Sequence, residues 1–331
     1  MTNTARGLVL RLLRDAGPMP RAELARRTGL SATTMTKVVG QLIADGCLAE
    51  GLAGAPRVGR PATDVALLPE AFWVVGVHGG PDGVRLGLRD LLGRAAGGAV
   101  PACGPLAEAI HALVAASGVD PARVLGVGVA APDRRVADRF GVPLGPGVVT
   151  GHDACAMALA EARYGCRARD LVYVHVDGGV SAGAVLDGRP FRPADLGHLR
   201  VTDDGPPCAC GGTGCLAAVI SGPALSARLS GGGGGQEGLM AAVAADAVLR
   251  DEVATWLATA LAAAVTLLGP EHVRLGGLFA AAPEDLLDRI RAALRDRTRE
   301  PVHLDRCGLG RDAGVAGAAA LALDRFFYRP D

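Results

Sequence analysis

The sequence predicts an α/β protein that begins with a winged helix-turn-helix. Three observations support this: three short helical patterns within the first 46 residues, a glycine- and proline-rich hairpin after them, and a long remainder in which apolar strand patterns alternate with helical ones. The chain has 331 residues, which is enough for two or three domains and a sizeable core.

Three helical patterns open the chain. The first, ARGLVLRLLRDAG, stops at Gly17, the second, RAELARRTG, stops at Gly29, and the third starts after Ser31, a residue type that caps helices. A tight turn before the third helix is typical of a helix-turn-helix, in which the third helix enters the major groove of DNA. Hydroxyl groups bond bases or phosphates, and lysine neutralises a phosphate. The candidate DNA-binding residues here are Ser31, Thr33, Thr34, Thr36 and Lys37.

A predicted wing follows over residues 47–70, CLAEGLAGAPRVGRPATDVALLPE, as two short strands joined by a glycine- and proline-rich tip. In that tip Arg57 and Arg60 flank Gly59, and a slim cationic segment suits a narrow minor groove. The formal net charge of the chain is zero, but residues 1–70 carry nine basic and six acidic residues. This excess permits nucleic-acid binding without proving it. A three-helix packing module with a solvated basic hairpin is the alternative.

The remainder, residues 71–331, has the alternation typical of an α/β fold. The strand patterns are FWVVGVHGG, RVLGVGVAAPD, DLVYVHVDGG and EHVRLGGL. The helical patterns are LAEAIHALVAASG, ACAMALAEARYG, DEVATWLATALAAAVTLLG and PEDLLDRIRAALRDR. We find no charge-free apolar run of about 18 residues and no signal-peptide pattern, so we expect a cytoplasmic protein that does not enter a membrane.

A group of metal-ligand residues lies in GHLRVTDDGPPCACGGTGCL, residues 197–216. One imidazole and three thiolates suit tetrahedral zinc, and four protein ligands leave no position for a catalytic water. The sequence therefore predicts a structural zinc site, with a reduced cysteine cluster and a catalytic zinc as alternatives. The predicted ligands are His198, Cys208, Cys210 and Cys215. The other cysteines are predicted to be ordinary buried residues, namely Cys47, Cys103, Cys155, Cys166 and Cys307.

The order of the glycine turns and the cysteine motif over residues 71–331 resembles the ROK family (repressors, open reading frames, sugar kinases). The resemblance implies a two-lobed, actin-like sugar-kinase (ATPase) fold behind the winged helix that ROK repressors carry and ROK kinases lack. It also implies a division into a DNA-binding domain at 1–70, a first lobe at 71–150 plus 308–331, and a second lobe with the zinc loop at 151–307.

The phosphate loops depart from the family pattern. In HGGP, residues 78–81, His78 replaces an Asp, and Pro81 removes a hydroxyl and a backbone N–H that a phosphate cradle needs. In DGGVSAG, residues 177–183, Asp177 adds negative charge where phosphate would approach, and Ser181 replaces a glycine. Together these changes predict that the chain binds no ATP, although His78 could also be an ordinary core histidine.

The sugar site that the resemblance implies also lacks some of the family's residues. Asp153 in GHDA aligns with the general base of the kinases and is a remnant of their catalytic site, while His152 replaces a sugar-binding Asn. Asp195 and His198 in ADLGH keep a carboxylate and an imidazole, whereas Ala217 replaces a sugar-binding Glu. These four retained positions, His152, Asp153, Asp195 and His198, are the candidate ligand-binding residues. Simpler roles are open too: a helix N-cap for Asp153 and a surface position for His152.

The resemblance implies a transcriptional regulator without enzyme activity, which controls carbohydrate-related or secondary-metabolism genes. It would bind a pseudo-palindromic double-stranded operator as a homodimer or tetramer, with a sugar or sugar derivative as effector. Two alternatives stay open. One is an active ROK sugar kinase with an appended DNA-binding domain, and the other is a ligand-independent regulator whose lobes serve only for oligomerisation.

Overall fold

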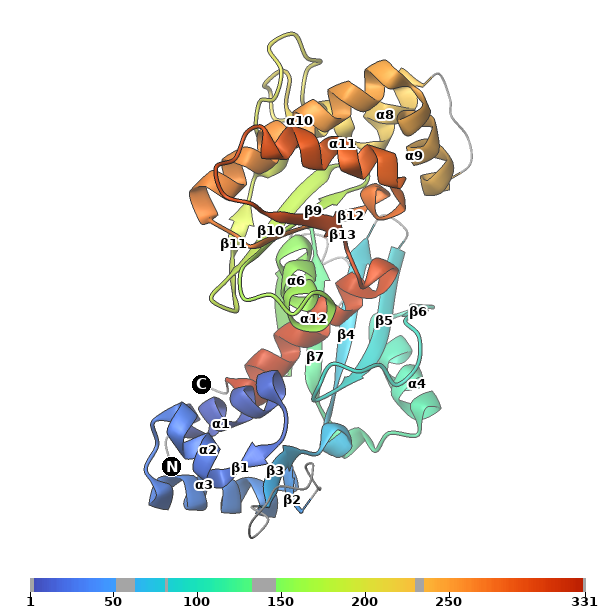
Figure 1. The fold of residues 1–331 in the computed structure, drawn as a ribbon. Coiled ribbons are helices and arrows are strands. Elements are labelled where there is room, and N and C mark those ends of the chain that lie inside the picture. Colours follow the sequence, from blue (N-terminus) through green and yellow to red (C-terminus); the bar gives the residue numbers. More distant parts are fainter. Residues whose placement is uncertain (1–2, 52–62, 81–82, 133–146, 230–234, 330–331) are drawn as a thin grey trace. The chain divides into compact units, whose positions relative to one another are not determined.

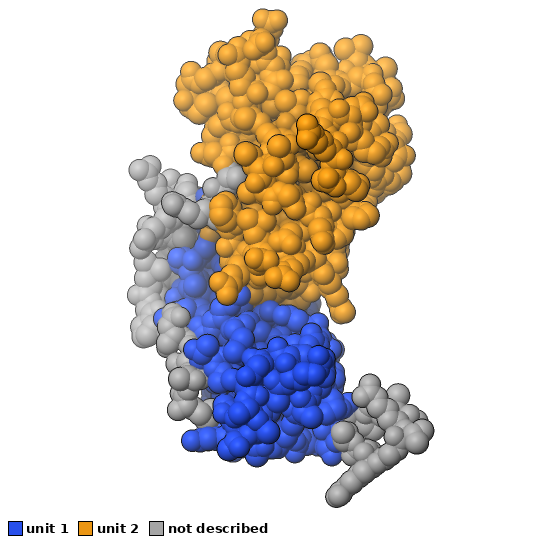
Figure 2. Space-filling view, turned by 60° about the vertical axis from the view of Figure 1, so that its left-hand side comes forward, with its two compact units in different colours: residues 1–151, 318–331 blue, residues 152–317 orange. Residues whose placement is uncertain are grey.

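The computed structural model describes residues 3–51, 63–80, 83–132, 147–229 and 235–329. The chain divides into two compact units, residues 1–151 with 318–331 and residues 152–317 (Figure 2). Residues 1–70 belong to the first unit, and their predicted boundary as a separate domain stays a prediction.

The first unit begins with a winged helix-turn-helix, as predicted (Figure 1). Left-handed Gly29, with φ of 71°, ends the second helix, and the Ser31 hydroxyl caps the third by accepting from the Thr34 amide at 3.2 Å. The strands form an antiparallel sheet in the order β1-β3-β2. The elements are α1 (Asn3–Ala16), β1 (Met19–Pro20), α2 (Arg21–Thr28), α3 (Ala32–Ala44), β2 (Leu48–Glu50) and β3 (Asp64–Leu67).

A five-stranded sheet in the order β6-β5-β4-β7-β8 follows in the first unit. Strand β4 pairs antiparallel with β5 and parallel with β7. The helix α12 lies so close to β7 that a Cβ at Gly128 would overlap the carbonyl of Ala318. The elements are η1 (Pro69–Ala71), β4 (Trp73–Gly80), β5 (Gly83–Asp90), β6 (Val100–Pro101), α4 (Leu106–Ser117), η2 (Pro121–Arg123), β7 (Val124–Ala131), β8 (Val148–His152), α12 (Ala313–Leu323) and the π-helical turn η7 (Asp324–Tyr328).

The winged helix shares one apolar core with the neighbouring sheet and with η7. Val9 of α1 and Val39 of α3 are fully buried in the same cluster as Val74 of β4, and so are Phe327 and Tyr328. Burial of apolar surface is the main stabilising contribution in such clusters. The winged helix is therefore packed into the first unit rather than tethered to it.

The second unit has a five-stranded sheet in the order β11-β10-β9-β12-β13. The strands β9, β12 and β13 are parallel, and β10 and β11 are antiparallel to their neighbours. Helices α10 and α11 cover one face of this sheet and α6 covers the other (Figure 1). The strands are β9 (Leu171–Val176), β10 (Val180–Leu186), β11 (Arg189–Ala194), β12 (His272–Gly277) and β13 (His303–Arg306). The helices are α6 (Asp153–Ala160), η3 (Glu161–Gly165), η4 (Leu196–His198), α7 (Leu216–Ile220), α8 (Gly222–Arg228), α9 (Gly235–Ala245), α10 (Ala247–Leu268), η5 (Leu278–Ala281), α11 (Glu284–Arg295) and η6 (Gly310–Asp312).

Small residues allow close packing around α6. A Cβ at Gly183 of β10 would overlap the carbonyl of Ala154, and a Cβ at Gly317 of α12 would overlap the backbone of Ala156. Only glycine lets two backbones approach this closely. The low aromatic content of the chain, 3%, agrees with a core of this kind.

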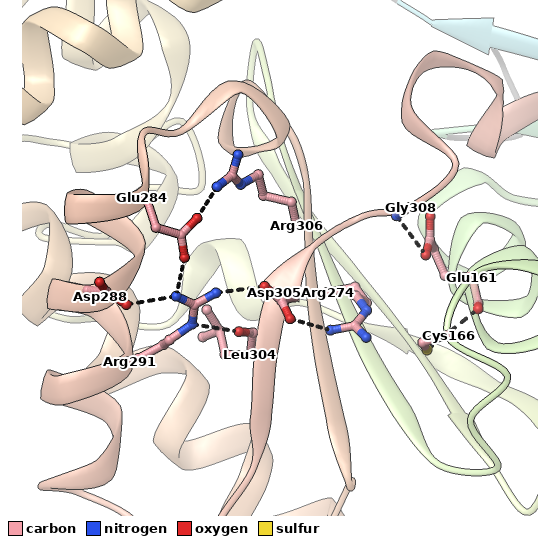
Figure 3. A network of polar contacts seen from close by, with 10 residues as sticks. All are labelled: Glu161, Cys166, Arg274, Glu284, Asp288, Arg291, Leu304, Asp305, Arg306 and Gly308. Atoms are coloured by element: carbon pink, nitrogen blue, oxygen red, sulfur yellow. Dashed lines mark hydrogen bonds and ion pairs between the residues drawn. The ribbon is translucent and has the colours of Figure 1, made fainter.

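A network of ion pairs joins α11 to β13 on the second unit (Figure 3). The Arg291 guanidinium lies 2.8 Å from Asp288 and 2.6 Å from Asp305, and it also binds Glu284. Its hydrogen bond lowers the pKa of the Glu284 carboxyl. Single exposed ion pairs contribute little to stability, but here three carboxylates share one guanidinium that is 22% exposed, so the pairs act as a network.

Within the described residues, α10 is the one helix long and apolar enough to cross a membrane. Its residues Val253, Leu257 and Leu261 are fully buried in the core of the second unit. A helix buried in a protein core can be as long and as apolar as a helix that spans a membrane, so packing in this core explains the composition of α10.

Candidate DNA-binding surface and metal centre

The third helix of the winged helix-turn-helix has a buried face and an exposed face. Met35, Val38 and Val39 are buried against the other helices, whereas Thr36 and Lys37 are exposed. The exposed residues are three or four positions apart and so lie on one face of the helix. Several of them could therefore contact DNA together if this face entered the major groove.

The five DNA-binding candidates of this helix fall into two groups. The hydroxyls of Ser31 and Thr34 lie 2.9 Å apart, and Ser31 also caps the helix. Thr33, Thr36 and Lys37 make no such bond within the described residues and stand exposed at positions i, i+3 and i+4. Ser31 and Thr34 thus shape the start of the helix, and the other three form its free surface.

Two exposed residues on this surface were missed by sequence reasoning. Gly40 continues the repeat from Thr33 at i+7, and Gln41 follows it. The Gln41 amide donates to Asp45 at 2.9 Å, and Asp45 is ion-paired with Arg6 at 2.8 Å. Extending the helical repeat by one more turn would have found both. The wing candidates Arg57, Gly59 and Arg60 lie outside the described residues and stay predictions.

The predicted zinc ligands come together in the second unit. His198 closes the short helix η4, and the three cysteines follow in the loop before α7. One ligand atom from each of the four residues lies within 4.8 Å of the others. His198 Nδ1 is 3.5 Å from Cys208 Sγ, and Cys210 Sγ is 3.6 Å from Cys215 Sγ.

These distances fit one tetrahedral ion. Zinc–sulfur bonds of about 2.3 Å place two sulfur ligands roughly 3.8 Å apart in a tetrahedron. The backbone of Gly212 lowers the pKa of Cys210, whereas burial and the neighbouring thiols raise the pKa of Cys215 to about 11, so a bound cation must stabilise the Cys215 thiolate. The four residues can therefore hold a metal ion.

Glycines make the loop around this site possible. Gly211 and Gly214 are left-handed, with φ of 89° and 66°. A Cβ at Gly214 would overlap the carbonyl of Thr202, and the Gly212 carbonyl accepts from the Cys208 amide at 2.8 Å. These turns bring Cys208 and Cys215 back toward each other.

The candidate ligand-binding residues lie at two places in the second unit, the start of α6 and the short helix η4. His152 Nδ1 lies 3.3 Å from a carboxylate oxygen of Asp153, which is 6% exposed. Asp153 is the first residue of α6 and His152 its N-cap, so the alternative of Asp153 as the N-cap is wrong. His152 is only partly exposed, with 27% of its side chain accessible. Asp195 is the N-cap of η4, and its carbonyl accepts a backbone bond from the His198 amide at 2.9 Å.

The structure adds His175 to the surroundings of Asp153. This histidine lies on β9, where burial lowers its pKa although the negative charge of Asp153 raises it. Its Nδ1 is 3.3 Å from the hydroxyl of the buried Tyr173. Sequence reasoning missed it, because a single polar residue in an apolar strand carries no distinctive signal.

The two loops that depart from the family pattern are described only in part. DGGVSAG forms a tight turn between β9 and β10, where the Asp177 amide donates to the Gly179 carbonyl at 2.8 Å. His78 lies near the end of β4, Pro81 lies outside the described residues, and Ala217 is in the first turn of α7. Among the remaining cysteines, Cys47 and Cys155 are buried as predicted, but Cys103 is exposed in a surface loop.

Comparison with known proteins agrees with this architecture of a DNA-binding head on a kinase-like fold. The ROK family profile matches residues 132–325, more than half of the chain, so the chain belongs to the ROK family. A winged helix-turn-helix DNA-binding profile matches residues 3–48.

The relatives include both kinases and regulators. The kanosamine kinase of Amycolatopsis mediterranei is 34% identical over half of this chain, and the match spans 59% of that enzyme. The DNA-binding transcriptional repressor Mlc of Escherichia coli is 24% identical over 96% of this chain and 92% of its own. The crystal structure of a ROK family transcriptional regulator, a homologue of Mlc, superimposes with a TM-score of 0.78 at 22% identity, covering 97% of both chains. At this identity the likeness shows the fold alone.

Membership of the ROK family and a winged helix-turn-helix together define a ROK-type DNA-binding regulator with a kinase-like part.

Proposed function

We propose that the chain regulates transcription by binding a pseudo-palindromic operator as a homodimer or tetramer. The observation that carries this proposal is the exposed face of α3, where Thr33, Thr36 and Lys37 stand free on a helix whose opposite face is buried. Such a face can enter the major groove, with hydroxyls at base edges and the ammonium on a phosphate. The wing arginines Arg57 and Arg60 would add contacts in the minor groove.

The kinase-like part serves as an effector and oligomerisation module without phosphoryl transfer. His78 and Asp177 stand in the two phosphate loops, where the kinases have a metal-facing Asp and a glycine-rich turn, and neither change helps to cradle a nucleotide. His152, Asp153, Asp195 and His198 would bind the effector, a sugar or sugar derivative. The genes under control would accordingly serve carbohydrate or secondary metabolism.

A structural zinc ion belongs to this proposal. His198 and the three cysteines would hold it, and it would stabilise the loop between η4 and α7 without taking part in a reaction. The ligand distances and the complete set of four protein donors support this role.

Selection of genomic DNA fragments by the purified chain tests the proposal. The expected result is a recurrent site with two inverted half-sites, and the neighbouring genes would identify the regulated process. Recovery of fragments without a common site at physiological salt would contradict it. The salt concentration must be held constant, because non-specific binding to phosphates weakens steeply with salt.

A second candidate function, sugar phosphorylation, rests on Asp153 alone. Its carboxylate is buried at the start of α6, at the position that aligns with the general base of the kinases. An ADP-release assay over a panel of hexoses and amino sugars separates the two functions. Turnover that disappears in Asp153→Asn would establish a kinase, whereas we expect no turnover above background.

A further inference from the structure

The π-helical turn η7, near the C-terminal end of the described chain, packs against the first helix of the winged helix-turn-helix. Arg11 of α1 donates to the Tyr328 carbonyl at 2.9 Å, and the Arg14 guanidinium lies 4.6 Å from the centre of the Tyr328 ring. A Cβ at Gly7 would lie only 2.7 Å from the same carbonyl. In Figure 1 this red end of the chain lies beside the blue helix α1.

Tyr328 also contacts the segment that joins the winged helix to the sheet. Its hydroxyl donates to the carbonyl of Leu91, and the Leu91 amide donates to the Pro69 carbonyl at 3.0 Å. Pro69 begins η1, which connects β3 of the wing to β4 of the sheet. The Tyr328 side chain thus contacts both Arg14 of α1 and the Leu91 carbonyl, and Leu91 in turn binds the connector η1.

Aromatic packing completes the contact. Phe327 is 2% exposed and lies 6.4 Å from the ring of Phe72, which follows η1, and the guanidinium of Arg6 lies 5.8 Å from the Phe327 ring centre. Phe327 and Tyr328 meet edge to face, with ring centres 5.1 Å apart. Aromatic and cation–π contacts of this kind depend on orientation as well as burial, so they define an angle and not only a distance.

We propose that η7, with Tyr328 as its central residue, sets the orientation of the winged helix-turn-helix on the first unit. Tyr328 is a positioning residue for DNA recognition: it touches no DNA itself but holds α1 and the connector in one arrangement. The proposal rests on the proposed binding of a two-half-site operator. In such a complex, the angle at which each head is held selects the spacing between half-sites.

The test measures binding of the full-length chain to operators whose half-site spacing varies in steps of one base pair, together with binding to a single half-site. The variants are Tyr328→Phe, which keeps the ring and removes the bond to Leu91, and Arg11→Met, which removes the bond to the Tyr328 carbonyl. The matched control is Tyr164→Phe, which removes the hydroxyl of a tyrosine in η3 of the second unit.

We expect the unmodified chain to prefer one spacing sharply. The measured preference is the ratio of the affinity at the preferred spacing to the affinity at a spacing that is two base pairs longer. In Tyr328→Phe this ratio should fall by about fivefold, the factor that one hydrogen bond of ordinary strength supplies. Arg11→Met should act in the same direction, and the affinity for a single half-site should stay within about twofold in both variants.

Three outcomes would overturn the inference: an unchanged spacing preference in both variants, an equal loss of affinity at all spacings and at the single half-site, or an unmodified chain that binds the half-site with no preferred spacing. Failure of the unmodified chain to recognise any half-site would instead contradict the proposed function. The two failures are therefore distinguishable.

Discussion

Lys37 is the only lysine of the chain, and it stands on the exposed face of α3. A lysine at this place acts as a point charge on a phosphate, so it contributes affinity without reading sequence. Thr33 and Thr36 on the same face can bond base edges, and they are the candidates for specificity.

We predict that Lys37→Ala weakens operator binding and lowers its dependence on salt. Loss of one phosphate contact should reduce the slope of log affinity against log salt by about 0.9. The slope is measured by titrations at several salt concentrations, with Lys37→Arg as the control that keeps the charge. A slope equal to that of the unmodified chain would show that Lys37 lies off the DNA.

Cys210 belongs to a group of four candidate metal ligands, three of which come from the loop between η4 and α7. Glycine turns shape this loop, but four donors on one ion would hold it far more firmly. The spacing of the cysteines and His198 predicted the group from sequence. The way Gly214 packs against Thr202 could not be predicted, because it depends on how distant parts of the loop meet.

Cys210→Ser should abolish binding of zinc in a one-to-one ratio and lower the melting temperature. Zinc content is measured by atomic emission and unfolding by thermal denaturation. Cys103→Ser, which alters an exposed cysteine outside the group, should leave both unchanged. Acidification should release zinc from the unmodified chain, since its ligands bind as thiolates and a neutral imidazole. An unchanged zinc content in Cys210→Ser would disprove the ligand assignment.

At the scale of elements, the sequence predicted four apolar strands, β4, β7, β9 and β12, and it missed the interior strands β5 and β10 as well as the edge strands. β11 contains two prolines, and β13 is a four-residue polar strand, so neither has the pattern of a core strand. Both form because they lie at the edges of a sheet that is already built, where pairing on one side suffices and proline is tolerated. The sequence pattern also placed the start of α10 too late, at Asp251, although Asp246 caps the helix with bonds of 3.0 Å to two amides and is a residue type that signals a helix start.

Glu161 connects two elements that are far apart in sequence. It is fully buried in η3, and its two carboxylate oxygens accept from the amides of Gly308 and Leu309 at 3.1 and 2.7 Å. These amides belong to the segment between β13 and η6, just ahead of α12. The carboxylate therefore holds the end of α6 to the approach of α12.

Glu161→Gln should lower the free energy of unfolding of the second unit by about 1–3 kcal/mol. The NH₂ group of the glutamine would face the backbone N–H of Gly308 or Leu309, which would then lack an acceptor. Urea denaturation followed by circular dichroism measures the loss. Glu237→Gln, at an exposed position on α9, is the control and should stay within about 0.5 kcal/mol of the unmodified chain. Equal stability of the two variants would show that the buried bonds are dispensable.

At the scale of the whole molecule, regulation requires that an effector bind two states of the protein unequally. The candidate effector residues His152, Asp153, Asp195 and His198 all lie in the second unit, and the DNA-binding elements lie in the first. The helix α12 begins in the second unit and ends in the first, so the chain itself supplies a continuous element between them.

A sugar effector should raise the melting temperature in a saturable manner, by an amount equivalent to about 2.7 kcal/mol at a concentration one hundred times its Kd. Thermal shifts against sugars and sugar phosphates measure this, and Asp153→Asn should abolish the response. Absence of stabilisation by the whole panel would favour a ligand-independent regulator whose lobes serve only for oligomerisation.

The contact between α1 and η7 has a consequence for synthesis of the chain. Arg11 and the Tyr328 carbonyl that it binds are 317 residues apart. The three helices of the winged helix-turn-helix are synthesised long before residues 327 and 328, which complete part of their apolar core. A nascent chain therefore carries an incomplete DNA-binding head until residues 327 and 328 have been made, and by then the kinase-like part has been synthesised.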